Sequence, residues 1–159
     1  MRLLEYCDTD WANDHEERKI TSGYVFYVGD TTFTWSTKKQ KVVALSTSEA
    51  ESIAPTTAAC ETMWLKNLLK EFYGEIDKVT TIYVDNKSAI TLAKNAVQRD
   101  RSKHIDMRYH FIRDAVKMGH IIIEHCSTKD QVADLFTKAL PTMRFVKLLK
   151  MLGMKKVLI

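Results

Sequence analysis

The chain has 159 residues, 45% of them hydrophobic and 28% charged, which predicts one folded domain over residues 1–159 and excludes a disordered chain. Its formal net charge of +4 is compatible with a nucleic-acid partner. The cysteines Cys7, Cys60 and Cys126 are too far apart for a close-spaced zinc motif, and no apolar run approaches the roughly 18 residues of a membrane span.

The first part of the chain predicts three strands. A strand is expected at about residues 2–8, a second at 24–28, which is aromatic and β-branched, and a third at 32–36, where polar and apolar residues alternate. Gly29 and Asp30 provide a turn between the last two, so the three strands are expected to form an antiparallel meander. A basic segment follows at 38–41.

The remaining elements alternate between helices and strands. Residues 46–49 (STSE) form a capping-box pattern and predict a long helix at about 47–72, with Pro55 inside it. The later pattern predicts a strand at 81–84, helices at 87–95 and 105–118, a strand at 121–123, and helices from about 130 and at 142–152. Strands joined through helices pair in parallel. The sequence therefore predicts an α/β fold with a five-stranded mixed sheet flanked by helices, a core at about 3–140 and a C-terminal helix at 142–152.

Acidic residues occur at the ends of several of these elements. Asp8 follows the first strand, and Asp85 follows the fourth. Glu51 lies in the first turns of the long helix, and Asp134 lies at the start of the helix expected from about 130. Ligand sites of α/β sheets form at the carboxyl ends of strands, and carboxylate oxygens suit Mg²⁺. Two such ions about 3.5–4 Å apart can activate water and stabilise the leaving oxygen in phosphodiester cleavage.

Seven segments carry a family resemblance that covers nearly the whole chain. They are residues 6–12 (YCDTDWA), 21–26 (TSGYVF), 35–40 (WSTKKQ), 44–51 (ALSTSEAE), 85–89 (DNKSA), 103–113 (KHIDMRYHFIR) and 130–138 (DQVADLFTK). In this order they resemble segments of the ribonuclease H domain of copia-type LTR-retrotransposon Pol polyproteins (Pseudoviridae). The resemblance implies a ribonuclease H-like fold and a metal-dependent endonuclease that cleaves the RNA strand of RNA–DNA hybrids during reverse transcription.

The resemblance also implies an Asp-Glu-Asp-Asp site that holds Mg²⁺ or Mn²⁺, with two ions expected. Its catalytic residues and metal ligands would be Asp8, Glu51, Asp85 and Asp134. Asp10 competes with Asp8 on the same strand face, and Asp8 is preferred because the family's first acid directly follows the apolar run of the strand. Glu49 competes with Glu51, which is preferred because Glu49 has a capping position. The alternative function is a catalytically weakened module that binds hybrid or supports reverse transcriptase.

Substrate contacts are expected beside this site. Ser46, Thr47 and Ser48 would contact 2′-hydroxyl and phosphate groups, since hybrids are recognised by shape. Lys38 and Lys39 would contact phosphates, and Asn86 is a further substrate-binding candidate. The expected partners are an RNA–DNA hybrid and the reverse transcriptase domain of the same polyprotein, with no membrane partner. The expected location is the cytoplasm, within a virus-like particle, or the nucleus.

Overall fold

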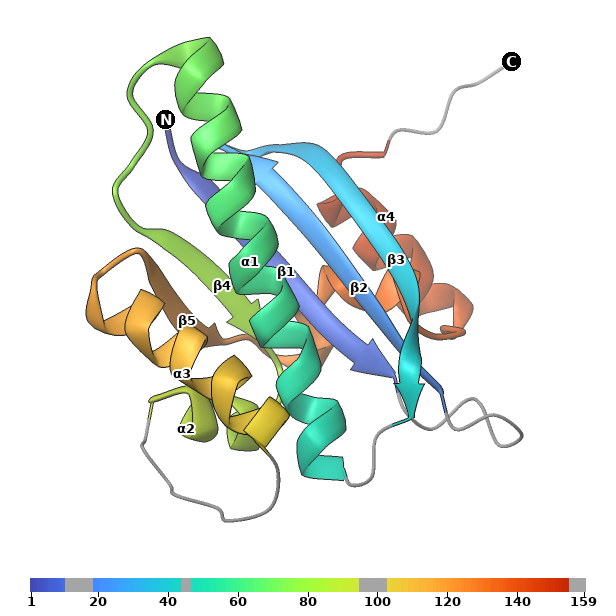
Figure 1. The fold of residues 1–159 in the computed structure, drawn as a ribbon. Coiled ribbons are helices and arrows are strands. Elements are labelled where there is room, and N and C mark those ends of the chain that lie inside the picture. The colour runs from blue at the N-terminus through green and yellow to red at the C-terminus, as the bar shows by residue number, and fades with distance from the viewer. Residues whose placement is uncertain (11–18, 44–46, 95–102, 155–159) are drawn as a thin grey trace.

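The computed structural model describes residues 1–10, 19–43, 47–94 and 103–154 and contains a five-stranded mixed sheet (Figure 1). The strands are β1 (Leu3–Asp10), β2 (Lys19–Val28), β3 (Thr31–Val43), β4 (Thr80–Val84) and β5 (Ile121–His125), in the order β3-β2-β1-β4-β5. β1, β2 and β3 pair antiparallel, whereas β4 pairs parallel to both β1 and β5. The predicted fold class is confirmed. β3 is longer than expected, because the basic segment at Lys38 and Lys39 continues its pairing with β2.

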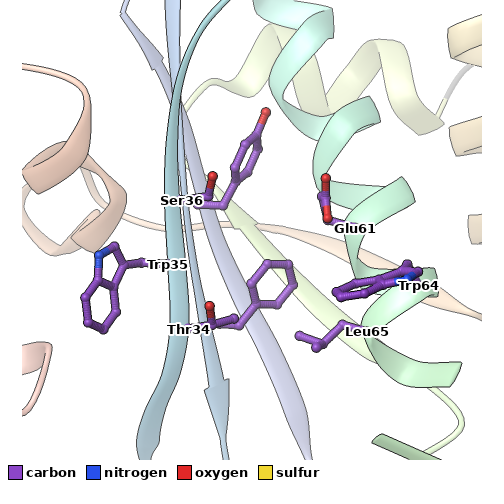
Figure 2. A pocket seen from close by; sticks show the side chains of 8 residues that line it. Thr34, Trp35, Ser36, Glu61, Trp64 and Leu65 are labelled. Atoms are coloured by element: carbon purple, nitrogen blue, oxygen red, sulfur yellow. The ribbon is translucent and has the colours of Figure 1, made fainter. Parts of the chain in front are cut away.

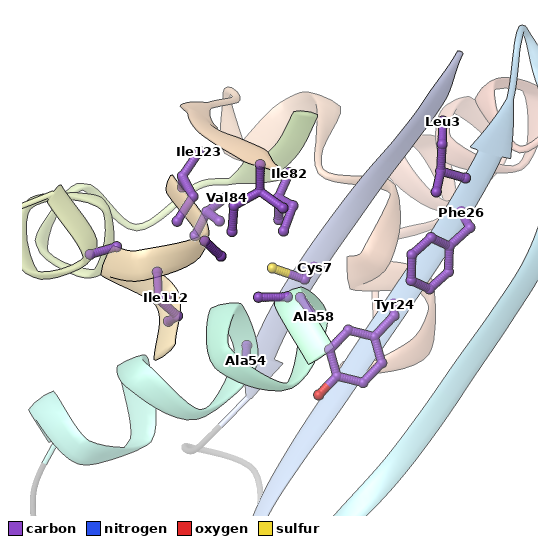
Figure 3. Packing of buried hydrophobic residues seen from close by; sticks show 14 of the residues in the cluster. Leu3, Cys7, Tyr24, Phe26, Ala54, Ala58, Ile82, Val84, Ile112 and Ile123 are labelled. Carbon is purple, nitrogen blue, oxygen red and sulfur yellow. The ribbon is translucent and has the colours of Figure 1, made fainter. Parts of the chain in front are cut away.

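Helices cover both faces of the sheet. The helices α1 (Thr47–Tyr73), α2 (Lys87–Lys94) and α3 (Lys103–Lys117) lie on one face, and α4 (Thr142–Met151) lies on the other (Figure 1). The larger apolar cluster fills the space under α1–α3 and includes Leu3, Tyr24, Ala58, Ile82 and Ile112 (Figure 3). None of the described helices has the length and hydrophobicity of a membrane span.

Pro55 does not interrupt α1, which runs continuously on both sides of it. Proline removes one backbone hydrogen bond to the carbonyl group of Glu51. Ala54, Ala58 and Ala59 beside it are buried, so this part of the helix is packed against the rest of the protein. Most helical stability in proteins comes from such packing, which compensates for the missing bond.

The helix expected from about residue 130 is wrong. The structure has two short 3₁₀ helices there, η1 (Thr128–Asp130) and η2 (Val132–Phe136), separated by Gln131. The buried Gln131 side chain accepts a hydrogen bond from the Ala133 amide at 3.3 Å and donates one to the Cys7 carbonyl at 3.0 Å. This side chain therefore caps η2 and holds it on β1, where a continuous α-helix would need a different path.

Gly23 allows η2 to lie directly on β2. A methyl group at Gly23 would lie 2.7 Å from Thr137 Cγ2 and 3.0 Å from the Ala133 carbonyl oxygen. Gly23 pairs with Asp8 in β1 and with Thr37 in β3, and the Thr37 hydroxyl donates to the Phe136 carbonyl at 2.8 Å. Three adjacent strands thus support the turn that carries Asp134.

Glu5 is a buried acid on the face of β1 that packs against α1, opposite to the face that carries Asp8. Its side chain has 0% exposure, and the Thr62 hydroxyl of α1 donates to its Oε2 atom at 2.5 Å. Burial raises the pKa of Glu5 well above 4.5; the Thr62 hydrogen bond opposes this shift, and the negative charge of Glu61 adds to it. The folded protein therefore retains a proton at Glu5 to a higher pH than the unfolded chain does.

Gly23→Ala is expected to destabilise the protein by about 1–3 kcal/mol, because the added methyl group displaces η2. The measurement is denaturant unfolding. Alanine otherwise favours strand structure over glycine by roughly 0.5–1 kcal/mol. A neutral or stabilising effect of Gly23→Ala would therefore contradict the close approach of η2 to β2.

Glu5→Gln is expected to reduce the pH dependence of stability. Because unfolding releases the Glu5 proton above the ordinary carboxyl range, wild-type stability should fall as the pH rises from about 4.5 towards the folded pKa. In the glutamine variant, the free energy of unfolding should fall less with rising pH. At the highest pH of the range the variant should therefore be more stable than wild type. Denaturant unfolding between pH 5 and 8 measures this, with Glu124→Gln as an exposed control. Equal slopes in wild type and Glu5→Gln would overturn the prediction.

Candidate active site

Three of the four predicted ligands meet at one edge of the sheet. Carboxylate oxygens of Asp8, Asp85 and Asp134, one from each residue, all lie within 4.8 Å of one another. Asp8 lies in β1, Asp85 directly follows β4, and Asp134 lies in η2. Since β1 and β4 are parallel neighbours, their carboxyl ends lie at the same edge. The third acid depends on how residues 131–137 are placed.

Gln131 positions the third acid against the other two. Its Nε2 atom donates to the Cys7 carbonyl at 3.0 Å and lies 3.5 Å from the Tyr83 carbonyl oxygen. Cys7 directly precedes Asp8, and Tyr83 lies two residues before Asp85. One buried amide group therefore connects the loop before Asp134 to both strands that carry the other acids.

Two basic side chains partly offset the charge of the cluster. Lys138 Nζ lies 3.1 Å from Asp8 Oδ2 and 2.9 Å from Asp134 Oδ1. Arg144, from α4, forms an ion pair with Asp134 Oδ2 and donates to the Thr128 carbonyl. The Thr137 hydroxyl donates to Asp8 Oδ2. Asp8 and Asp134 are both buried, so these contacts compensate for the lost hydration of their charges.

The acids still influence each other's ionisation. The pKa of Asp134 is raised to about 6, chiefly by burial and next by the neighbouring Asp8 charge, while Lys138 opposes the shift. Burial and Asp8 also raise the pKa of Asp85. For Lys138, burial lowers the pKa, but the charges of Asp8 and Asp134 outweigh this and leave it above 10.5. Clustered carboxylates that disfavour one another's charge are typical of divalent-metal sites.

The donor set fits a divalent metal ion. Three carboxylates are hard oxygen ligands of the kind that Mg²⁺ and Mn²⁺ prefer, and their 4.8 Å spread is small enough for shared coordination. Lys138 lies between two of these acids, so a metal ion and the lysine ammonium group would compete for the same oxygens. The site can hold a cation, and among the described side chains the Lys138 ammonium group lies in that position.

The other predicted site residues have different outcomes. Glu49 and Glu51 lie in α1, but their side chains fall outside the part that the structure describes, as do those of Thr47 and Ser48 and the whole of Ser46. Asp10 ends β1, on the same face as Asp8 and two residues further along. Lys38 and Lys39 are exposed on β3, the edge strand. Their roles in substrate binding stay predictions.

Asn86 has a structural contact that we did not predict. Its Oδ1 atom accepts hydrogen bonds from the backbone amides of Ser88 at 2.8 Å and Ala89 at 3.2 Å. These are the contacts of a helix N-cap, and α2 begins at the next residue. The side chain therefore holds the start of α2 beside Asp85, and its role in substrate binding stays a prediction.

A pocket on the α1 face of the sheet is separate from the acidic cluster. It is lined by residues of β2, β3 and α1, among them Tyr24, Ser36, Glu61 and Trp64 (Figure 2). Trp35 also borders it, but its ring points to the other side of β3 (Figure 2) and stacks on Phe136, with centroids 6.2 Å apart. Trp35 thus supports the end of η2 from the edge of the sheet.

Four residues with direct contacts at the site were not predicted: Gln131, Thr137, Lys138 and Arg144. The first three belong to the segment 130–138 that carries the family resemblance, so the signal was in the sequence. Lys138 is also four residues after Asp134, a spacing that favours ion pairs. Arg144 gives no comparable signal, because it reaches Asp134 from α4.

Comparison with known proteins supports the family resemblance. The chain is 42% identical over 152 residues to the retrovirus-related Pol polyprotein from transposon TNT 1-94 of Nicotiana tabacum, and 39% identical over 157 residues to that from transposon RE2 of Arabidopsis thaliana. These matches cover 96% and 99% of the chain, but only 11% of each relative's length. No protein-family model matches the chain.

Solved structures with the same fold are more distant in sequence. The N-terminal RNase H domain of a Mycobacterium tuberculosis protein superposes with a TM-score of 0.60 at 12% identity, covering 94% of this chain and 96% of that domain. LC11-RNase H1, in complex with an RNA/DNA hybrid, gives a TM-score of 0.61 at 12% identity, covering 85% and 93%. These likenesses support the fold, and the Pol relatives support the family. The chain therefore belongs with the copia-type retrovirus-related Pol polyproteins, of which it corresponds to a segment with the ribonuclease H fold.

Proposed function

We propose that this chain hydrolyses the RNA strand of RNA–DNA hybrids with divalent metal ions, as part of reverse transcription by a longer Pol polyprotein. The observation that carries the proposal is the meeting of Asp8, Asp85 and Asp134, from three separate elements, within 4.8 Å. Acids used only as helix caps or surface charges have no reason to converge, because their repulsion costs stability. A cation bound between the three carboxylates would offset this repulsion.

Asp8, Asp85 and Asp134 would hold Mg²⁺ or Mn²⁺, and Glu51 is the proposed fourth ligand. Two bound ions would supply an activated water and stabilise the leaving oxygen of the phosphodiester. The chain's own contribution is to fix the carboxylates. Gln131 fixes the backbone before Asp134, and Thr137 fixes the Asp8 carboxylate through its hydroxyl.

The proposed substrate is a hybrid duplex bound by its shape and phosphates. LC11-RNase H1, which shares this fold, has been solved with an RNA/DNA hybrid. The exposed Lys38 and Lys39 of β3 would supply phosphate contacts, and Ser46, Thr47, Ser48 and Asn86 are the other proposed substrate contacts. We place the reaction in a virus-like particle of the cytoplasm or in the nucleus, beside the reverse transcriptase part of the polyprotein.

Asp85→Asn is expected to reduce cleavage of the RNA strand by more than the roughly 10- to 100-fold that loss of an outer-shell partner costs, because it removes a direct ligand. The assay uses end-labelled RNA–DNA hybrid with Mg²⁺ or Mn²⁺. Asp30→Asn, an exposed acid in the β2–β3 turn, is the matched control and should cleave like wild type.

The outcomes of this assay separate the two functions. Cleavage that survives Asp85→Asn would remove the catalytic assignment. Hybrid binding without cleavage by wild type, at high protein concentration, would favour the alternative of a module that binds hybrid or supports reverse transcriptase. Duplex DNA and duplex RNA serve as substrate controls.

Lys138→Met is expected to lower the stability of the metal-free protein by about 1–3 kcal/mol, because Asp8 and Asp134 lose a shared counter-ion. The same change should increase the stabilisation that Mn²⁺ provides, because the ion no longer competes with an ammonium group. Thermal unfolding with and without Mn²⁺ measures both effects. A smaller Mn²⁺-induced shift than in wild type would mean that Lys138 does not occupy the cation position.

A further inference from the structure

α4 connects the β2–β3 hairpin to the acidic cluster. At its C-terminal end, the Tyr27 hydroxyl donates to the Met151 carbonyl at 3.1 Å, and the Thr32 hydroxyl donates to the Leu152 carbonyl at 2.7 Å. Leu148, in the middle of the helix, has 0% exposure. The C-terminal end of the helix is therefore held on the sheet, and its N-terminal half lies beside η1 and η2.

The N-terminal half of α4 makes two polar contacts with these turns. Arg144 binds the Asp134 carboxylate and the Thr128 carbonyl through the same nitrogen, Nη2. One turn further along, Lys147 donates to the Lys129 carbonyl at 3.1 Å and pairs with Asp130 at 2.6 Å. Lys147 and Asp130 are both about half exposed, whereas Asp134 is fully buried. Only the arginine contact reaches a carboxylate of the cluster.

We propose that Arg144 is a positioning residue that holds Asp134 in the orientation required for metal binding, so that α4 is an integral part of the metal site. This inference rests on the proposed function. It assigns to Arg144 a role that differs from that of Lys138, although both pair with the same acid.

The difference follows from which oxygen each cation contacts. Lys138 contacts Asp134 Oδ1 and also Asp8, so it lies inside the cluster. Arg144 contacts Asp134 Oδ2, together with the Thr128 carbonyl outside the cluster. A metal ion that joins Asp8 and Asp134 would displace Lys138 but can leave Arg144 in place. Arg144 is therefore the contact that can hold the carboxylate in both the metal-free and the metal-bound protein.

Loss of Arg144 would leave Lys138 as the remaining basic group that pairs with Asp134 among the described residues. The carboxylate would then be free to rotate towards Lys138, which competes with the metal ion. Removing one partner of a buried ion pair also leaves a charge that must find compensation. The uncompensated charge alone would favour a cation, so the proposal requires that the loss of orientation and the closer pairing with Lys138 outweigh it.

The test measures Mn²⁺ binding by isothermal titration calorimetry for wild type, Arg144→Met, Arg144→Lys and Lys147→Met, with thermal unfolding of each metal-free protein. Arg144→Met should bind Mn²⁺ about 10- to 100-fold more weakly than wild type, the usual cost of losing an outer-shell partner. Arg144→Lys should recover part of this loss, because it restores a positive charge near Oδ2. Lys147→Met removes a neighbouring contact of α4 and should change the affinity less than twofold.

The possible failures are distinguishable. Wild-type protein that does not bind Mn²⁺ would overturn the proposed function and this inference together. Wild-type binding with equal or tighter binding by Arg144→Met would overturn the inference alone. Equal weakening by Arg144→Met and Lys147→Met would also overturn it, because the effect would then follow from looser packing of α4. If Arg144→Met does not fold, the same criteria apply to Arg144→Lys, which should bind more weakly than wild type.

Discussion

The acidic edge of this protein depends on the close contact between residues 131–137 and the strands β1 and β2. Gly23 provides the space, since any larger residue there would meet Thr137 and the Ala133 carbonyl. Gln131 attaches this segment to β1, because its side chain donates a hydrogen bond to the Cys7 carbonyl and accepts one from the Ala133 amide. Without this contact Asp134 would have no fixed relation to Asp8 and Asp85. The geometry of the acidic cluster is therefore set first by backbone packing, and only then by the charges of its side chains.

Charge then limits what this packing permits. Three carboxylates with oxygens within 4.8 Å repel one another, and burial increases the cost. Lys138 and Arg144 reduce that cost by binding different oxygens of Asp134. These two side chains supply positive charge to the cluster from within the protein. A divalent ion would replace Lys138 beside Asp8 and Asp134, whereas Arg144 of α4 would keep its contact with Asp134 Oδ2.

Sequence reasoning predicted the parts of this arrangement that depend on local pattern. The order of strands and helices was sufficient to predict the mixed sheet and to bring Asp8 and Asp85 to one edge, because adjacent parallel strands end together. The helix predicted after β5 was wrong. The η1 and η2 turns found there depend on a hydrogen bond from Gln131 to Cys7 of β1, which lies 124 residues away in the sequence. Arg144 could not be found from periodicity, since its partner lies on another element. Glu51 was predicted from family resemblance, and its side chain lies outside the described residues.

The three described acids consequently differ in how firmly their positions are determined. Asp8 lies within the ladder of β1, and Asp85 follows β4, so the register of the sheet determines both backbones. Asp134 lies on a 3₁₀ turn, whose hydrogen bonds are poorer than those of a sheet or an α-helix. Its position therefore requires support from Gly23, Gln131 and α4. In a site of this kind, the ligand on the irregular element is the one whose geometry is most sensitive to changes in the surrounding protein.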